Sequence, residues 1–171
     1  GQDMYFLASQ YFKVIQKANL KFDAMYGPAY KGIPLATAIS QLFYVEEQKK
    51  IELIFDRKEI KDHGEGGNII GHIEGDVLII DDVLSAGTAA KEAINTVEQS
   101  GTQPAKYVLV GLDRQEKGQG ELSARTELES QFDIKVLSII SLDTLIDYID
   151  SDRTLDASLS AMRDYRQVWG A

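Results

Sequence analysis

The sequence has 171 residues, a length that suits one domain over residues 1–171 with its own hydrophobic core. Its formal net charge of −9 argues against general binding to nucleic acid or to anionic membranes, because the overall field repels phosphate. The lack of cysteine excludes disulfides and thiolate metal sites and fits a cytoplasmic location, and no apolar run approaches the length of a membrane span.

Hydrophobic periodicity predicts helices and strands that alternate along most of the chain. Apolar residues at helical spacing predict helices over 3–18, 31–47, 85–99, 121–131, 141–149 and a last stripe over 155–169. Short apolar runs predict strands over 22–26, 51–55, 77–80, 107–112 and 135–140. We expect the helical stripes that include Leu7, Tyr11 and Trp169 to face the core. The alternation favours an α/β fold with a central parallel β-sheet flanked by helices.

The segment VLIIDDVLSAGTAA, residues 77–90, is the strongest indication of chemistry. Ligands of open parallel sheets bind at the carboxyl ends of strands, and amides at a helix N-terminus suit a phosphate. Asp81 and Asp82 would repel that phosphate unless they bind sugar hydroxyls, or a magnesium ion that also holds phosphate. The alternative is an acidic strand end that caps a helix. Neither the glycine–lysine pair of a nucleoside-triphosphate loop nor a G-x-G-x-x-G turn is present.

A cationic cluster lies in RKEIKDHGEGG, residues 57–67. Its members are Arg57, Lys58, Lys61 and His63. In an acidic chain, cations next to hinge-like glycines suit a mobile loop that meets a departing anion. A charge run of this kind is otherwise a solvated surface, and that alternative stays open on the residues alone.

Two further segments place polar side chains next to predicted strands. In GPAYKGIPLA, residues 27–36, Tyr30 and Lys31 follow a strand and would point into a cleft; the alternative is an ordinary turn with an exposed lysine. In LDRQEKGQGE, residues 112–121, the guanidinium of Arg114 could bind a carboxylate in a bidentate manner. The alternative for Arg114 is a surface ion pair with Glu116 or Glu121.

The segment 77–90 resembles the phosphoribosyl pyrophosphate motif of the type I phosphoribosyltransferases. Within that group, the segments 27–36, 57–67 and 112–121 resemble the orotate phosphoribosyltransferases, and they occur along the chain in the family's order. The resemblance covers nearly the whole chain and implies their Rossmann-like fold. It also implies transfer of the 5-phosphoribosyl group from phosphoribosyl pyrophosphate to orotate. The products would be orotidine 5-monophosphate and pyrophosphate, in the biosynthesis of the pyrimidine nucleotide UMP.

The same resemblance assigns roles to individual residues. It implies that Asp81 and Asp82 bind the ribose hydroxyls and that the turn from Ser85 to Ala89 binds the 5-phosphate. The positions implied for phosphoribosyl pyrophosphate are Tyr30, Lys31, Asp81, Asp82, Val83, Leu84, Ser85, Ala86, Gly87, Thr88 and Ala89. Ser85 and Arg114 are implied for orotate. Many family members have threonine where this chain has Ser85, and the shared hydroxyl predicts that the role is kept.

For the cationic loop, the resemblance implies a catalytic role across a homodimer. The loop 57–67 would close over the neighbouring subunit's site, with Lys61 as the most critical of Arg57, Lys58, Lys61 and His63. Magnesium would be the cofactor, held mainly by the substrate and without direct side-chain ligands. We predict no catalytic role for His72, and the presence of only two histidines and no cysteine argues against a zinc site.

One expectation about the N-terminus and two rival functions accompany this interpretation. Family members usually carry a further N-terminal segment before GQDMYF, and we expect it to be either removed, or disordered and omitted, here. A phosphoribosyltransferase for another base is the first rival function. A ligand-sensing regulator of nucleotide genes with this fold is the second, although the net charge of −9 and the lack of a basic stripe speak against a nucleic-acid surface.

Overall fold

The computed structural model describes residues 1–57, 69–72, 74–99, 104–151 and 156–171. The strands are β1 (Ala24–Gly27), β2 (Glu52–Asp56), β3 (Ile69–Ile70), β4 (Val77–Leu84), β5 (Ala105–Asp113) and β6 (Lys135–Ser141). The helices are α1 (Gln2–Lys17), α2 (Gly32–Glu47), α3 (Thr88–Gln99), α4 (Ala124–Phe132), α5 (Leu142–Ser151) and α6 (Asp156–Trp169). Among the described helices, none combines the length and the apolar character needed to cross a membrane.

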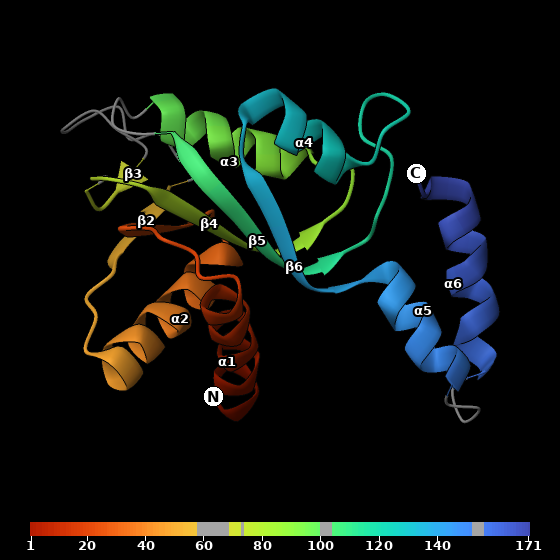
Figure 1. Ribbon diagram of the computed structural model, residues 1–171, viewed down its shortest axis with the longest axis horizontal. Coiled ribbons are helices and arrows are strands. Elements are labelled where there is room, and N and C mark those ends of the chain that lie inside the picture. Colours follow the sequence, from red (N-terminus) through yellow and green to blue (C-terminus); the bar gives the residue numbers. More distant parts are fainter. Residues whose placement is uncertain (58–68, 73, 100–103, 152–155) are drawn as a thin grey trace.

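The strands form one sheet in the order β3-β2-β1-β4-β5-β6 (Figure 1). All neighbouring pairs are parallel except β2 and β3, which pair antiparallel. The predicted α/β fold with a central parallel sheet is therefore confirmed. The short strand β3 was not predicted, because two apolar residues give no periodic signal.

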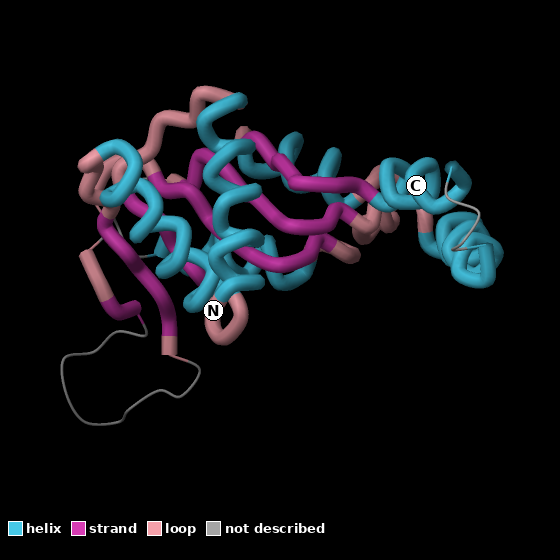
Figure 2. Tube along the Cα trace, turned by 90° about the horizontal axis from the view of Figure 1, so that it is seen from below, coloured by secondary structure: helices cyan, strands magenta, loops and turns pink. Residues whose placement is uncertain are grey.

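Helices cover both faces of the sheet (Figures 1 and 2). Along β4, the side chains of Leu78 and Ile80 pack in the cluster with α1 and α2, whereas Val77 and Ile79 pack in the cluster with α3 and α4. Successive side chains of a strand point to opposite faces, so a strand covered on both faces is apolar at every position. This explains the continuous apolar run that predicted β4.

Strand β4 is longer than predicted and continues through the acidic pair. Asp81 pairs with Val110, and Leu84 pairs with Asp113 of β5. Helix α3 begins at Thr88 rather than at residue 85, which leaves a turn between β4 and α3. Pairing with β5 holds the polar end of β4 in the sheet, although the sequence of that end has no strand pattern. Because β4 extends further, α3 begins later than predicted.

Helices α5 and α6 form a hairpin that extends beyond the sheet (Figure 1). Only some of its apolar residues are covered: Ile149 and Leu159 are buried, whereas the Trp169 side chain is 57% exposed. On α1, Tyr11 is fully buried but Leu7 is 38% exposed. The expectation that Leu7 and Trp169 face the core was therefore wrong. Trp169 lies on a hairpin that has no sheet face to cover it.

Candidate active site

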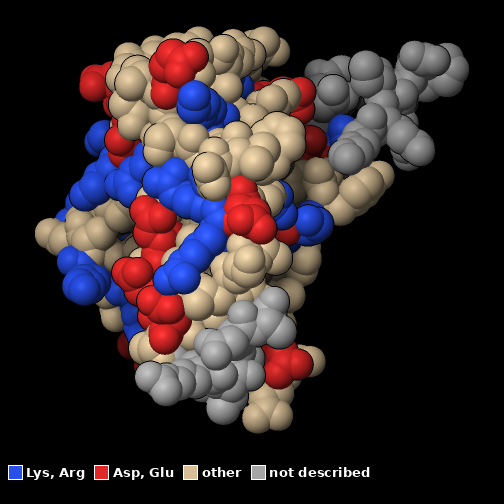
Figure 3. Space-filling view, turned by 90° about the vertical axis from the view of Figure 1, so that its right-hand side faces the viewer, with Lys and Arg blue, Asp and Glu red and all other residues tan. Residues whose placement is uncertain are grey.

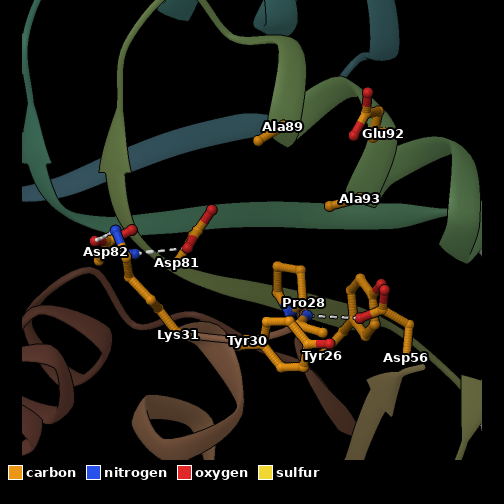
Figure 4. A pocket seen from close by; sticks show the side chains of 11 residues that line it. Tyr26, Pro28, Tyr30, Lys31, Asp56, Asp81, Asp82, Ala89, Glu92 and Ala93 are labelled. Atoms are coloured by element: carbon orange, nitrogen blue, oxygen red, sulfur yellow. Dashed lines mark hydrogen bonds and ion pairs between the residues drawn. The ribbon is translucent and has the colours of Figure 1, made fainter. Parts of the chain in front are cut away.

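A pocket of about 590 Å³ lies where β1 and β4 end at their carboxyl edge (Figure 4). From the predicted site residues, it brings together Tyr30, Lys31, Asp81, Asp82 and Ala89. These residues come from the segment after β1, from β4 and from the start of α3. Chain segments that are far apart in the sequence therefore converge at the edge where ligands of such sheets bind.

The acidic pair and a lysine form the centre of the pocket. The amide of Asp82 donates to the Asp81 Oδ1 atom at 2.8 Å, and Lys31 Nζ donates to the Asp82 Oδ2 atom at 2.7 Å (Figure 4). Burial raises the pKa of Asp81 to about 6, with the charge of Asp82 adding to the effect and the Asp82 amide opposing it. The hydrogen bond to Asp82 raises the pKa of Lys31. The pocket therefore presents both acceptors and a cation to a polar ligand.

The turn between β4 and α3 requires a glycine at residue 87. Gly87 has a φ angle of +87°, which side chains other than glycine rarely adopt. A Cβ atom at this position would also lie 3.2 Å from the Cβ atom of Ala124. Leu84 is buried and fixes the start of the turn in the core, while Ala86 and Thr88 are exposed. Binding of the 5-phosphate by Ser85 to Ala89 stays a prediction, as does the contact of Val83 and Leu84 with phosphoribosyl pyrophosphate.

The segment after β1 is fastened to the end of β2. The amide of Ala29 donates to the Asp56 Oδ1 atom at 2.7 Å (Figure 4). A Cβ atom on Gly32 would lie 2.8 Å from the carbonyl oxygen of Ile80, so a glycine is needed where α2 approaches β4. These contacts fix Tyr30 and Lys31 at the mouth of the pocket.

Six residues that line the pocket are not among the predicted site residues, namely Tyr26, Pro28, Ala29, Asp56, Glu92 and Ala93. Pro28 and Ala29 belong to the segment 27–36, which the sequence singled out, whereas the other four lie outside the predicted segments. Burial, followed by the charge of Asp56, raises the pKa of Tyr26 above its usual range. The position of Asp56 directly before the cationic segment was a signal that could have drawn attention to it. Glu92 and Ala93 lie on the first turns of α3, where nothing in the sequence separates pocket residues from ordinary helix residues.

Arg114 lies next to the turn between β4 and α3 but outside the lining of the pocket. Its amide donates to the carbonyl oxygen of Leu84 at 2.9 Å, which places it at the end of β4 and β5. Its Nη1 atom lies 3.6 Å from the Glu116 Oε1 atom. The predicted alternative, an ion pair with Glu116, is thus present. That contact leaves the predicted binding of orotate untested.

The segment that follows Arg114 is held by α4. Glu127 accepts hydrogen bonds from the amides of Gln119 at 2.9 Å and Gly120 at 2.7 Å, and these bonds lower its pKa. Ser123 caps α4 by accepting from the amide of Thr126 at 3.2 Å. The loop that carries Arg114 is therefore fixed at both of its ends.

Of the cationic cluster, the structure describes only Arg57, which is exposed directly after β2. Lys58, Lys61 and His63 lie outside the described residues, and their predicted roles stay predictions. His72, to which we assign no role, forms a 2.9 Å contact between its Nε2 atom and Glu74 Oε1.

The fold and the acidic strand end before a helix N-terminus define a phosphoribosyltransferase domain, and the phosphoribosyl transferase domain family matches residues 2–123. A curated orotate phosphoribosyltransferase from Marinobacter nauticus is 46% identical, over 99% of this chain and 80% of its own length. One from Cellvibrio japonicus is 43% identical over 99% and 79%. The chain belongs to the orotate phosphoribosyltransferase family.

Solved structures agree with this assignment. The orotate phosphoribosyltransferase of Francisella tularensis has a TM-score of 0.81 at 33% identity, covering 100% of this chain and 82% of that one. The Mycobacterium tuberculosis enzyme, solved in complex with 5-phospho-alpha-D-ribosyl 1-diphosphate, has a TM-score of 0.61 at 19% identity. That match covers 83% of this chain and 75% of the other, and shows that the two share a fold.

Proposed function

We propose that this chain transfers the 5-phosphoribosyl group from phosphoribosyl pyrophosphate to orotate, giving orotidine 5-monophosphate and pyrophosphate in UMP biosynthesis. The observation that carries the proposal is the pocket in which Asp81 and Asp82 lie near the carboxyl end of β4, shortly before the turn into α3, and Lys31 binds Asp82. Relatives that are 46% and 43% identical bear the name of this activity.

The pocket suggests how each part of the sugar phosphate would bind. The carboxylates of Asp81 and Asp82 can accept hydrogen bonds from ribose hydroxyls. The amides from Ser85 to Ala89 precede and begin α3, and they suit the 5-phosphate. Lys31 holds Asp82 at 2.7 Å and is otherwise 74% exposed, so its ammonium can turn toward an entering pyrophosphate. That exchange would free Asp82 for the sugar.

The reaction breaks the bond between C1 and the pyrophosphate oxygen through a transition state with oxocarbenium character. Negative charge grows on the leaving pyrophosphate. We propose that Arg57, Lys58, Lys61 and His63 stabilise this charge and exclude water, with Lys61 the most important. We further propose a homodimer in which each subunit's loop serves the neighbouring site.

We propose a magnesium ion that takes its ligands mainly from the substrate. The ion would take phosphate and water oxygens as ligands, and the carboxylates of Asp81 and Asp82 in the same pocket would add negative charge near it. When bound, the ion would neutralise charge on the pyrophosphate. We propose Mg²⁺ as the cofactor on this basis.

The test is the loss of orotate absorbance when the protein is mixed with phosphoribosyl pyrophosphate and Mg²⁺, together with pyrophosphate release. We expect both signals with orotate. When a purine base replaces orotate, we expect no release of pyrophosphate. Turnover of a purine base in place of orotate would support the first rival function. Binding of phosphoribosyl pyrophosphate without pyrophosphate release would support a ligand-sensing regulator.

A further inference from the structure

A hydrogen bond between the two residues that flank Arg114 holds the backbone at this position. Asp113, a buried acid at the end of β5, accepts a 2.8 Å hydrogen bond from the amide of Gln115. Gln115 has a φ angle of +55°, so the chain turns sharply after Arg114. The Arg114 side chain itself is 44% exposed and leaves this turn as a long flexible group. Its guanidinium therefore needs support from another element.

That support comes from α6. The Nη1 atom of Arg114 donates to the hydroxyl of Tyr165 at 3.4 Å, and the same hydroxyl donates to Glu116 Oε1. The Tyr165 hydroxyl thus contacts both the cation and the carboxylate. Burial, followed by the bond to Glu116, raises the pKa of Tyr165 above its ordinary value, so the hydroxyl is a donor at neutral pH as an unperturbed tyrosine would be.

The end of α6 is fastened to the segment that follows Arg114. The amide of Lys117 donates to the carbonyl oxygen of Trp169 at 2.9 Å, and Glu116 forms a β-bridge with Gly170. The Nε atom of Arg166 donates to Asp143 Oδ1 of α5 at 2.9 Å. The position of Tyr165 is therefore set by the α5–α6 hairpin. On this side of the molecule, acidic and basic side chains alternate over the surface (Figure 3).

The contact with Tyr165 affects which N–H donors of the Arg114 guanidinium are available to a ligand. Glu116 lies 3.6 Å from the guanidinium, longer than a close charge-assisted hydrogen bond, and it has the Tyr165 hydroxyl as a second partner. A guanidinium carries five N–H donors, so most of them stay available. Arg114 also lies close enough to Lys31 for the two charges to repel. It therefore borders the site in which the base must meet the sugar.

We propose that Tyr165 is a positioning residue that holds the Arg114 guanidinium ready for the carboxylate of the base, and so sets selectivity for carboxylated pyrimidines. Arg114 contacts the ligand, and Tyr165 acts through Arg114. The proposal rests on the proposed function, because it needs a substrate base that carries a carboxylate. It adds the C-terminal helix to the elements that determine specificity.

The test compares two nucleotides that differ only in the carboxylate of the base, orotidine 5-monophosphate and uridine 5-monophosphate. Their dissociation constants are measured by calorimetry for the wild-type protein and for Tyr165→Phe. We expect Tyr165→Phe to weaken binding of orotidine 5-monophosphate about tenfold, the scale of one lost hydrogen bond to a charged group. Binding of uridine 5-monophosphate should change less than about twofold, because it does not use Arg114 in this way.

Tyr148→Phe is the matched control, since Tyr148 lies on α5 of the same hairpin and its side chain is 62% exposed. This control should bind both nucleotides like the wild type. Equal loss of both nucleotides in Tyr165→Phe, or no loss of either, overturns the proposal while the proposed function stands. If the wild-type protein fails to prefer orotidine 5-monophosphate and does not consume orotate, the proposed function itself is wrong.

Discussion

The hydroxyl of Tyr11 on α1 donates a 2.8 Å hydrogen bond to the backbone carbonyl oxygen of Asp81 in β4. Tyr11 is fully buried, and burial raises its pKa above the usual range, with the charges of Asp82 and Asp81 adding to the shift. A Cβ atom on Gly111 would lie 2.9 Å from the Tyr11 oxygen, so the neighbouring strand needs a glycine to admit the hydroxyl. The first helix thus supports the backbone of the acidic pair directly.

We predict that Tyr11→Phe lowers the free energy of unfolding by about 1–3 kcal/mol, because the buried carbonyl of Asp81 loses its partner. Urea denaturation measures the change. The affinity for phosphoribosyl pyrophosphate should fall as well, since the Asp81 backbone is no longer held. Tyr44→Phe on α2 is the control, as this side chain is 61% exposed, and it should leave both quantities unchanged. Equal stability of Tyr11→Phe and wild type would contradict the prediction.

The raised pKa of Asp81 predicts a pH-dependent cost to stability. Its folded pKa of about 6 exceeds the ordinary value of 3.8, so between these values the folded state binds more protons than the unfolded state. Stability contributed by this group is therefore lost as the pH rises from about 4 to about 6. Above that window, the folded protein carries the full cost of a partly buried charge.

Asp81→Asn removes this cost and keeps the Oδ1 atom that accepts from the Asp82 amide. We expect its stabilising effect to be larger at pH 7.5 than at pH 4.5 by about 1 kcal/mol, a value reduced to allow for the partial exposure of Asp81. Urea denaturation without ligand, at both pH values, measures the difference. A stabilisation that is the same at both pH values would show that the pKa of Asp81 is ordinary.

The sequence predicted the sheet and the acidic strand end because both depend on local patterns. The run 77–80 is apolar at every position since both sheet faces are covered, and carboxylates directly after such a run stand out. Tyr11 was assigned to the core, but its hydrogen bond to Asp81 could not be foreseen. That contact joins residues 70 positions apart, and no local pattern encodes such a partner.

The contact of Arg114 with Tyr165 shows the same limit. Arg114 was identified from its segment, whereas Tyr165 was assigned only to an apolar stripe of the last helix. The structure instead places its hydroxyl between Arg114 and Glu116, 51 and 49 positions away along the chain. A tyrosine on such a stripe can bury its ring and still present its hydroxyl to a polar partner.

A substitution of Gly87 tests the geometry of the turn between β4 and α3. We predict that Gly87→Ala lowers the free energy of unfolding by about 1–2 kcal/mol, because a φ angle of +87° is strained for alanine and the new Cβ atom meets Ala124 at 3.2 Å. The turn should shift, which weakens binding of phosphoribosyl pyrophosphate. Denaturation and calorimetry measure the two effects. Gly1→Ala, whose Cβ atom would have nothing within 4 Å, should be silent in both.

The cationic loop is tested through Lys61 and Asp82, which the proposed dimer places in one site from different subunits. We expect Lys61→Ala to lower turnover roughly 100-fold while binding of phosphoribosyl pyrophosphate falls less, because the charge that it meets develops in the transition state. Asp82→Ala should be inactive because the sugar loses an acceptor. Unchanged turnover in Lys61→Ala would contradict the catalytic role.

Mixing the two inactive variants then distinguishes donation across the interface from action within one subunit. In a hybrid dimer, one site combines the intact Lys61 loop with an intact Asp82 pocket, and the other site carries both defects. Random exchange of subunits should therefore restore about a quarter of the wild-type turnover. If each loop served its own subunit, every site would keep one defect. Hybrid dimers verified by mass that recover no activity would therefore rule out donation in trans.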